Sequence, residues 1–112
     1  MITQQSSEIV SHRLERLAAI YRQCQASELM DKTLDKLFDY EAETCRAQIR
    51  DIEKDLSFFE QQYGQSSDLF YQSFQEGKTD DRLDFVEWAS IVQMVERLKN
   101  RLELLTAVEK NA

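Results

Sequence analysis

Hydrophobic residues recur every three or four positions along most of this chain, which is the spacing of helices that bury one face. The longest run of this pattern contains Phe38, Ala42, Cys45, Ile49, Ile52, Leu56, Phe59 and Tyr63. A later run of comparable length contains Phe85, Trp88, Ile91, Val92, Val95, Leu98, Leu102 and Leu105. The two runs predict an antiparallel, coiled-coil-like helical hairpin with arms over residues 28–63 and 81–109.

The residues between the two arms predict a short helix at the tip of the hairpin. Gly64 and Gly77 are expected to stop helices, and Ser66 or Ser67 is expected to cap the helix between them. Asp84 and Glu87 have the spacing of a capping box for the last helix. Aromatic residues from three consecutive helices predict a structural core at the tip, made of Phe59, Tyr63, Phe70, Phe74, Phe85 and Trp88.

A separate amphipathic helix is predicted near the N-terminus, with Ser6 or Ser7 as its cap. Its narrow apolar stripe needs a covering partner and is a candidate oligomer interface, made of Val10, Leu14, Leu17, Tyr21 and Cys24. The periodicity slips over residues 25–31, where Ser27 is a candidate cap for a new helix; the competing interpretation is one continuous helix. The predicted fold is therefore all-α, with an N-terminal arm over residues 1–27 and a hairpin domain over 28–112.

The composition narrows the possible partners and the compartment. The chain has no proline and two glycines, which disfavours an all-β fold, and a net charge of −7, which disfavours nucleic acid and anionic membranes. No apolar stretch reaches the roughly 20 residues of a membrane-spanning helix, and no signal peptide is evident. We expect a cytoplasmic protein in which Cys24 and Cys45 are reduced, buried on apolar seams and not disulfide-bonded.

The sequence offers little catalytic or metal-binding chemistry. His12 is the only histidine, and no cysteine or acid lies at metal-ligand spacing from it. Residues 76–88 resemble part of a calcium-binding loop, but Lys78 and Asp81 stand where a ligand and a glycine are required. Asp81, Asp84 and Glu87 would share one side of a helix, as in magnesium-dependent phosphohydrolases, without a facing acidic pair. We therefore expect no catalytic residues, no metal and no cofactor.

One family resemblance is carried by the residues at the hairpin tip. These residues are Phe59-Glu60-Gln61-Gln62-Tyr63-Gly64, Ser67, Phe70, Phe74-Gln75-Glu76-Gly77, Asp81 and Asp84-Phe85-Val86-Glu87-Trp88. The pattern resembles small acidic helical prokaryotic proteins of the TumA-like antitoxin family. The resemblance covers residues 34–105, and the chain departs from the pattern at Gln65 and Lys78-Thr79.

The resemblance implies a protein that binds and neutralises a cognate toxin through its helical surface, and the expected class of toxin is a basic nuclease. The family has no catalytic residues to transfer to this chain. The alternative function is a homo-oligomeric coiled-coil scaffold or adaptor without a toxin, and a third, weaker alternative is a metal-dependent helical phosphohydrolase. A homo-oligomer is expected under both of the first two interpretations.

Overall fold

A computed structural model describes residues 4–107 of the chain, with side chains from Ser6 onward, and all of its regular structure is helical. The elements are α1 (Gln4–Arg22), α2 (Glu28–Tyr63), α3 (Ser67–Gln75) and α4 (Leu83–Thr106). The chain divides into two compact units, Met1–Lys36 and Leu37–Ala112, so that α2 begins in the first unit and continues through the second. The division falls inside α2, later than the expected boundary after residue 27.

The first unit contains a sharp corner between α1 and α2. The Cys24 amide donates to the Tyr21 carbonyl at 3.1 Å and the Gln25 amide donates to the Ile20 carbonyl at 2.9 Å, which is the Schellman arrangement for ending a helix. Cys24 adopts a φ of +56° in this turn, and Ser27 accepts a hydrogen bond from the Met30 amide at 3.1 Å. The expected corner and Ser27 cap are confirmed, and the alternative of one continuous helix is wrong.

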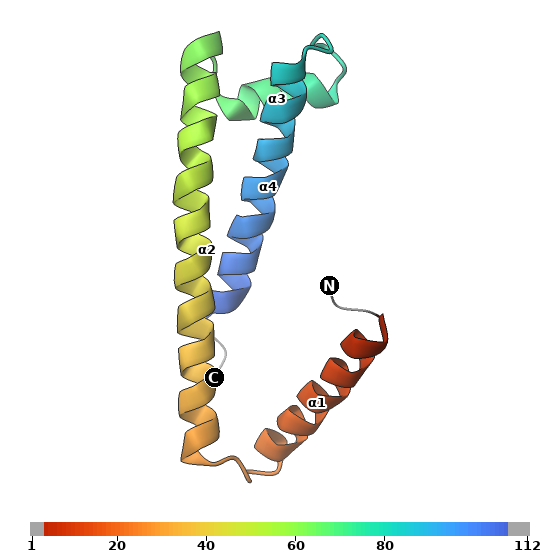
Figure 1. Cartoon of the computed structure of the whole chain (residues 1–112), viewed down its shortest axis with the longest axis vertical. Helices are drawn as coiled ribbons and strands as arrows, with labels where there is room; N and C mark the ends of the chain where they lie inside the picture. Colours follow the sequence, from red (N-terminus) through yellow and green to blue (C-terminus); the bar gives the residue numbers. More distant parts are fainter. Residues whose placement is uncertain (1–3, 108–112) are drawn as a thin grey trace. The chain divides into compact units, whose positions relative to one another are not determined.

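The second unit is the predicted hairpin. In Figure 1, α4 runs back alongside α2 in the opposite direction, and α3 lies across the end of the pair. Along the seam the Cys45 thiol donates to the Leu98 carbonyl at 3.1 Å, and Arg101 pairs with Glu41 at 3.0 Å. The buried seam residues Cys45, Ile49 and Val95 are flanked by half-buried side chains: Ile52, Leu56, Leu98, Leu102 and Leu105.

The tip of the hairpin holds the largest buried side chains of the second unit. Trp88 and Phe70 have no exposed surface, and their rings are stacked with centroids 3.9 Å apart and planes inclined by 2°. Phe59 is also stacked on Trp88, at 5.6 Å. The structure brings all six expected core aromatics to this cluster, with Tyr63, Phe74 and Phe85 half-buried at its edge, and it adds the buried Ala89.

Hydrogen bonds hold the N-terminal end of α3 in place. Its cap is Ser66, whose hydroxyl accepts from the Leu69 amide at 3.2 Å. Ser67 has another role: its amide donates to the Glu60 carboxylate at 2.8 Å, and its hydroxyl accepts from the Trp88 indole Nε1 at 3.0 Å. Glycines with positive φ values of 66° and 72° follow α2 and α3 as expected, at Gly64 and Gly77.

Three sequence-based expectations about helix ends and cysteines are wrong. Cys24 is exposed, because it lies in the turn after α1 and not on the apolar seam. Neither Ser6 nor Ser7 caps α1, because the helix already begins at Gln4. The residue before α4 is Arg82, which makes no side-chain capping bond, so the capping box of Asp84 and Glu87 is absent. The last helix begins at Leu83, and its expected end at Glu109 lies outside the described residues.

Replacing the central tryptophan is expected to remove most of the stability of the hairpin. Trp88→Ala should lower the free energy of unfolding by about 3–5 kcal/mol, because it leaves a large cavity between α2, α3 and α4. Trp88→Phe should cost less, because an aromatic ring remains and only the hydrogen bond to Ser67 and part of the volume are lost. Urea denaturation followed by circular dichroism measures both changes.

The control for this prediction is Leu104→Ala, at a position that is 79% exposed in the same helix as Trp88. This change should alter stability by less than about 0.5 kcal/mol. Wild-type stability in Trp88→Ala would contradict a core centred on this residue.

Candidate functional site

The predicted oligomer interface lies on α1, and the structure leaves much of it uncovered. Ile9, Val10 and Leu14 are 47%, 45% and 59% exposed, whereas Leu17 and Tyr21 are half-buried. No described side chain of α1, from Ser6 to Arg22, is fully buried. Four of the five predicted interface residues therefore share the helix, while Cys24 lies in the turn that follows it.

Tyr21 connects α1 to the first turn of α2 within the first unit. Its hydroxyl donates to the Asp31 carboxylate at 2.7 Å. The pKa of Tyr21 is raised to about 12, and this hydrogen bond is the largest cause. Desolvation and the negative charges of Asp31 and Asp35 act in the same direction. At neutral pH the tyrosine is therefore a hydrogen-bond donor that fixes the end of α1 against α2.

The acidic side chains between α3 and α4 form ion pairs with nearby cationic residues and do not form an open ring of metal ligands. Lys78 pairs with Glu76 at 3.3 Å, and Arg82 binds Asp80 through two nitrogens at 3.0 and 2.9 Å. Hydrogen bonds and charge from Arg82 lower the pKa of Asp80. Among the described residues, no group of three or more potential ligand side chains has an arrangement that could hold a metal ion.

Asp84, the expected capping residue, instead ties α4 to α2. The Tyr63 hydroxyl donates to its carboxylate at 2.5 Å, and this bond, with a contribution from desolvation, raises the pKa of Tyr63. The Arg82 guanidinium lies 4.7 Å from the centre of the Phe85 ring. Three acids of the tip, Glu76, Asp80 and Asp84, are thus used in structural contacts. Sequence reasoning missed the bond from Tyr63 to Asp84 because its partners are 21 residues apart.

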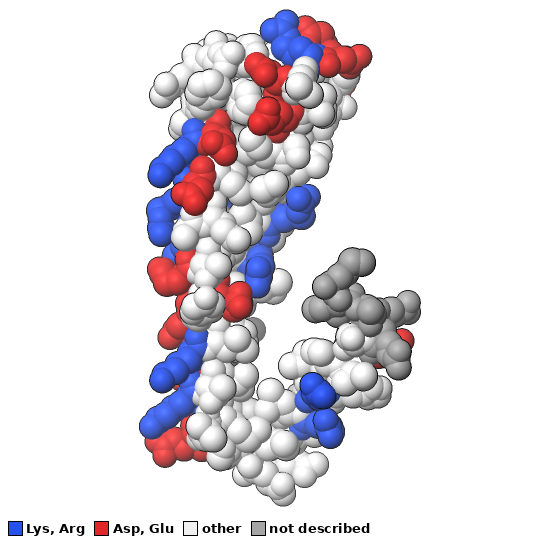
Figure 2. Space-filling view, viewed as in Figure 1, with Lys and Arg blue, Asp and Glu red and all other residues white. Residues whose placement is uncertain are grey.

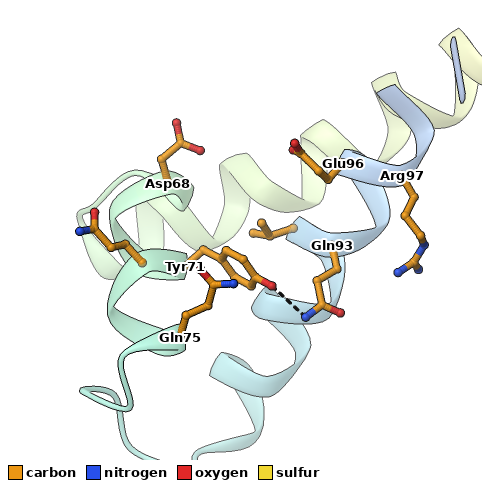
Figure 3. Close-up of a pocket in the computed structure, with 8 residues that line it drawn as sticks. Asp68, Tyr71, Gln75, Gln93, Glu96 and Arg97 are labelled. Carbon is orange, nitrogen blue, oxygen red and sulfur yellow. Dashed lines mark hydrogen bonds between the residues drawn. The ribbon is translucent and has the colours of Figure 1, made fainter. Parts of the chain in front are cut away.

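A hollow of about 490 Å³ lies between α3 and α4 in the second unit. Figure 3 shows the Tyr71 ring between the two helices, with a hydrogen bond of 2.9 Å from the Gln93 amide to its hydroxyl. The surrounding walls carry side chains of both charges and several carboxamides: Asp68, Gln72, Gln75, Glu96 and Arg97. Nothing in the sequence pattern indicated this hollow, because it depends on how α3 crosses α4.

Charge is distributed unequally between the two units. The first unit has five basic and five acidic residues, so the whole net charge of −7 belongs to residues 37–112. Figure 2 shows acidic and basic side chains interspersed along α2, and further acidic side chains around the tip. Several of these acids have cationic neighbours, such as Glu53 with Lys99 at 3.6 Å. The second unit therefore presents a predominantly negative surface.

Comparisons with known proteins add no assignment: no family model, no curated protein and no solved structure matches the chain. Within residues 4–107, no helix combines the length and the apolar character needed to cross a membrane. The candidate functional features are thus the apolar stripe of α1 and the hollowed, acidic surface of the second unit.

The contact between α1 and α2 predicts a specific pH response. A raised pKa means that the folded protein favours the neutral phenol, so the stabilisation is fully present below about pH 10 and is lost as the pH rises through about 12. Asp31→Asn should move the titration of Tyr21 back toward 10, because the carboxylate that accepts the phenol hydrogen is gone. NMR of tyrosine labelled with ¹³C at Cζ measures each phenol separately.

Tyr63 is the internal control for this titration, because its own partner is Asp84. Its midpoint should not change in Asp31→Asn. An unaltered Tyr21 midpoint in that variant would show that the hydrogen bond to Asp31 is not the cause of the shift.

Proposed function

We propose that this protein acts by binding another protein through its helical surface, and that this partner is a toxin which it neutralises. The observation that carries the binding function is the exposed stripe of α1, where three large aliphatic side chains remain about half exposed. Contiguous apolar groups on a helix favour association, since covering them removes their surface from water. The identity of the partner as a toxin is supported by the resemblance of residues 34–105 to the antitoxin family.

The charge of the second unit supports a basic partner. Residues 37–112 carry the entire net charge of −7, and opposite charge on a partner would speed the encounter. A basic nuclease toxin has this character, since it must itself bind nucleic acid phosphates. The stripe would then supply the apolar contact and the second unit the electrostatic attraction.

A homo-oligomeric scaffold is the second candidate function, and the same stripe favours it. Val10, Leu14, Leu17 and Tyr21 alternate steps of four and three, which is the spacing of a seam between two helices. A second copy of α1 presents the same spacing and could cover the stripe symmetrically. Self-association and toxin binding are compatible if the oligomer is the form that meets the toxin.

The toxin proposal is tested by co-expression with the product of the gene next to this one. That product should inhibit growth alone, co-purify with this protein and lose its toxicity in its presence. Val10→Asp with Leu14→Asp should abolish co-purification, because two charges are placed in the stripe. The matched control is Leu83→Asp with Leu104→Asp, at positions 78% and 79% exposed on α4. A neighbouring product that is neither toxic nor bound would contradict the toxin proposal.

Self-association is tested on the full chain alone by light scattering at micromolar concentration. We expect a mass of at least two chains, falling toward the monomer mass of 13.2 kDa in the Val10→Asp/Leu14→Asp variant. The helix content should remain, because both positions are exposed on α1 and lie outside the hairpin core. A 13.2 kDa species in the wild type would contradict the oligomer. The stripe would then serve only to bind a different protein.

A further inference from the structure

Two neighbouring hollows of the second unit, together called the groove, lie at the crossing of α3 and α4. The first hollow, of about 490 Å³, lies between these two helices. The second, of about 390 Å³, lies where α2, the beginning of α3 and α4 meet. Asp68, Val92 and Glu96 line both hollows, so these three residues stand where the two hollows meet.

The first hollow combines an apolar base with polar walls. Tyr71 and Val92 are half-buried and provide the apolar surface, and the hydrogen bond from Gln93 fixes the position of the tyrosine hydroxyl. The side chains of Gln72 and Gln75 stand beside them. Carboxamides offer both donors and acceptors, which suits the N–H and C=O groups of an extended peptide.

The shared part of the groove carries two carboxylates without a cationic partner. Asp68 comes from the first turn of α3 and Glu96 from α4, and neither makes an ion pair with a described residue. Lys99, which lines the second hollow, pairs with Glu53 instead. Arg97 extends away from Asp68 in Figure 3. A cation held between these two carboxylates would therefore have to come from a ligand.

We propose that this groove binds an extended peptide segment of a partner protein that carries an arginine or a lysine. The cationic group lies between Asp68 and Glu96, and the aliphatic part of its side chain packs on Tyr71 and Val92. Charge complementarity selects this occupant, because the two unpaired carboxylates lie on the unit that carries the whole net charge of −7. The inference rests on the proposed protein-binding function and gives it a site separate from α1.

The probe for this site is the peptide acetyl-Leu-Arg-Leu-amide, compared with the same peptide containing citrulline. Citrulline has nearly the shape of arginine but no charge, so the pair isolates the electrostatic contribution. In ¹⁵N NMR titrations of the full chain, the arginine peptide should shift the resonances of residues 68–75 and 92–97, including the Gln93 carboxamide. Its affinity should exceed that of the citrulline peptide by at least fivefold at low salt, and the difference should shrink as salt screens the charges.

The variant Asp68→Asn/Glu96→Gln should abolish the preference for arginine with little change in shape. The matched control is Asp55→Asn/Glu103→Gln, which removes the same two charges from exposed positions that line neither hollow. The control should retain the preference. Equal affinity for the two peptides, or shifts spread over acidic residues of the whole surface, would overturn the site.

Two further outcomes separate this inference from the proposed function. If the arginine peptide fails while the neighbouring gene product still co-purifies, the groove assignment is wrong and the binding function stands. If Asp68→Asn/Glu96→Gln instead lowers the oligomer mass in light scattering, the groove receives a basic residue of a second copy, such as Arg13 or Arg16. That result would overturn the assignment to a separate partner.

Discussion

Burying the Trp88 indole imposes the main constraint on the second unit. The ring has no exposed surface, so its Nε1–H group must find an acceptor inside the protein, and that acceptor is the Ser67 hydroxyl. Ser67 is in turn fixed by the hydrogen bond from its amide to Glu60 of α2. The reversal at Gly64 brings Ser67 back toward Glu60, which requires the positive φ of the glycine. The tryptophan, the serine and the turn therefore depend on one another.

The same constraint explains how a helix of nine residues is stable at the tip. A helix this short is not stable alone in water. Its first amide groups are satisfied by Ser66 and Glu60, and its apolar face rests on the Trp88 cluster. Within the described residues, no buried side-chain nitrogen or oxygen is left without a hydrogen-bond partner. The tip thus joins three helices into one folded unit, and the seam between α2 and α4 extends from it.

Periodicity and glycines predicted most of this fold, because both are local properties of the sequence. The long helix, the short helix and the stops at Gly64 and Gly77 follow from them. Cys24 was expected on the buried seam but lies in the turn after α1, where it adopts the left-handed conformation that glycine usually supplies, so composition carried no signal for this turn. Asp84 was expected to cap α4 because the spacing along the chain suggested only local partners. Its actual partner, Tyr63, lies on another helix. The groove between α3 and α4 likewise depends on tertiary packing, which spacing along the chain does not encode.

The two units differ in how much of their polar surface is paired, and how much of their apolar surface is buried, within the unit. The tip pairs its aromatic rings, its indole nitrogen and most of its charges internally, which gives a rigid frame. In α1, by contrast, the intermediate exposure of Leu17 and Tyr21 and the greater exposure of Ile9, Val10 and Leu14 leave apolar surface in water. Burying an aliphatic side chain completely, starting from full exposure, contributes about 1.5–3 kcal/mol, so the partly covered Ile9, Val10 and Leu14 retain a fraction of this free energy for association. The tip is therefore held together by its own contacts, whereas α1 keeps apolar surface whose burial would favour association.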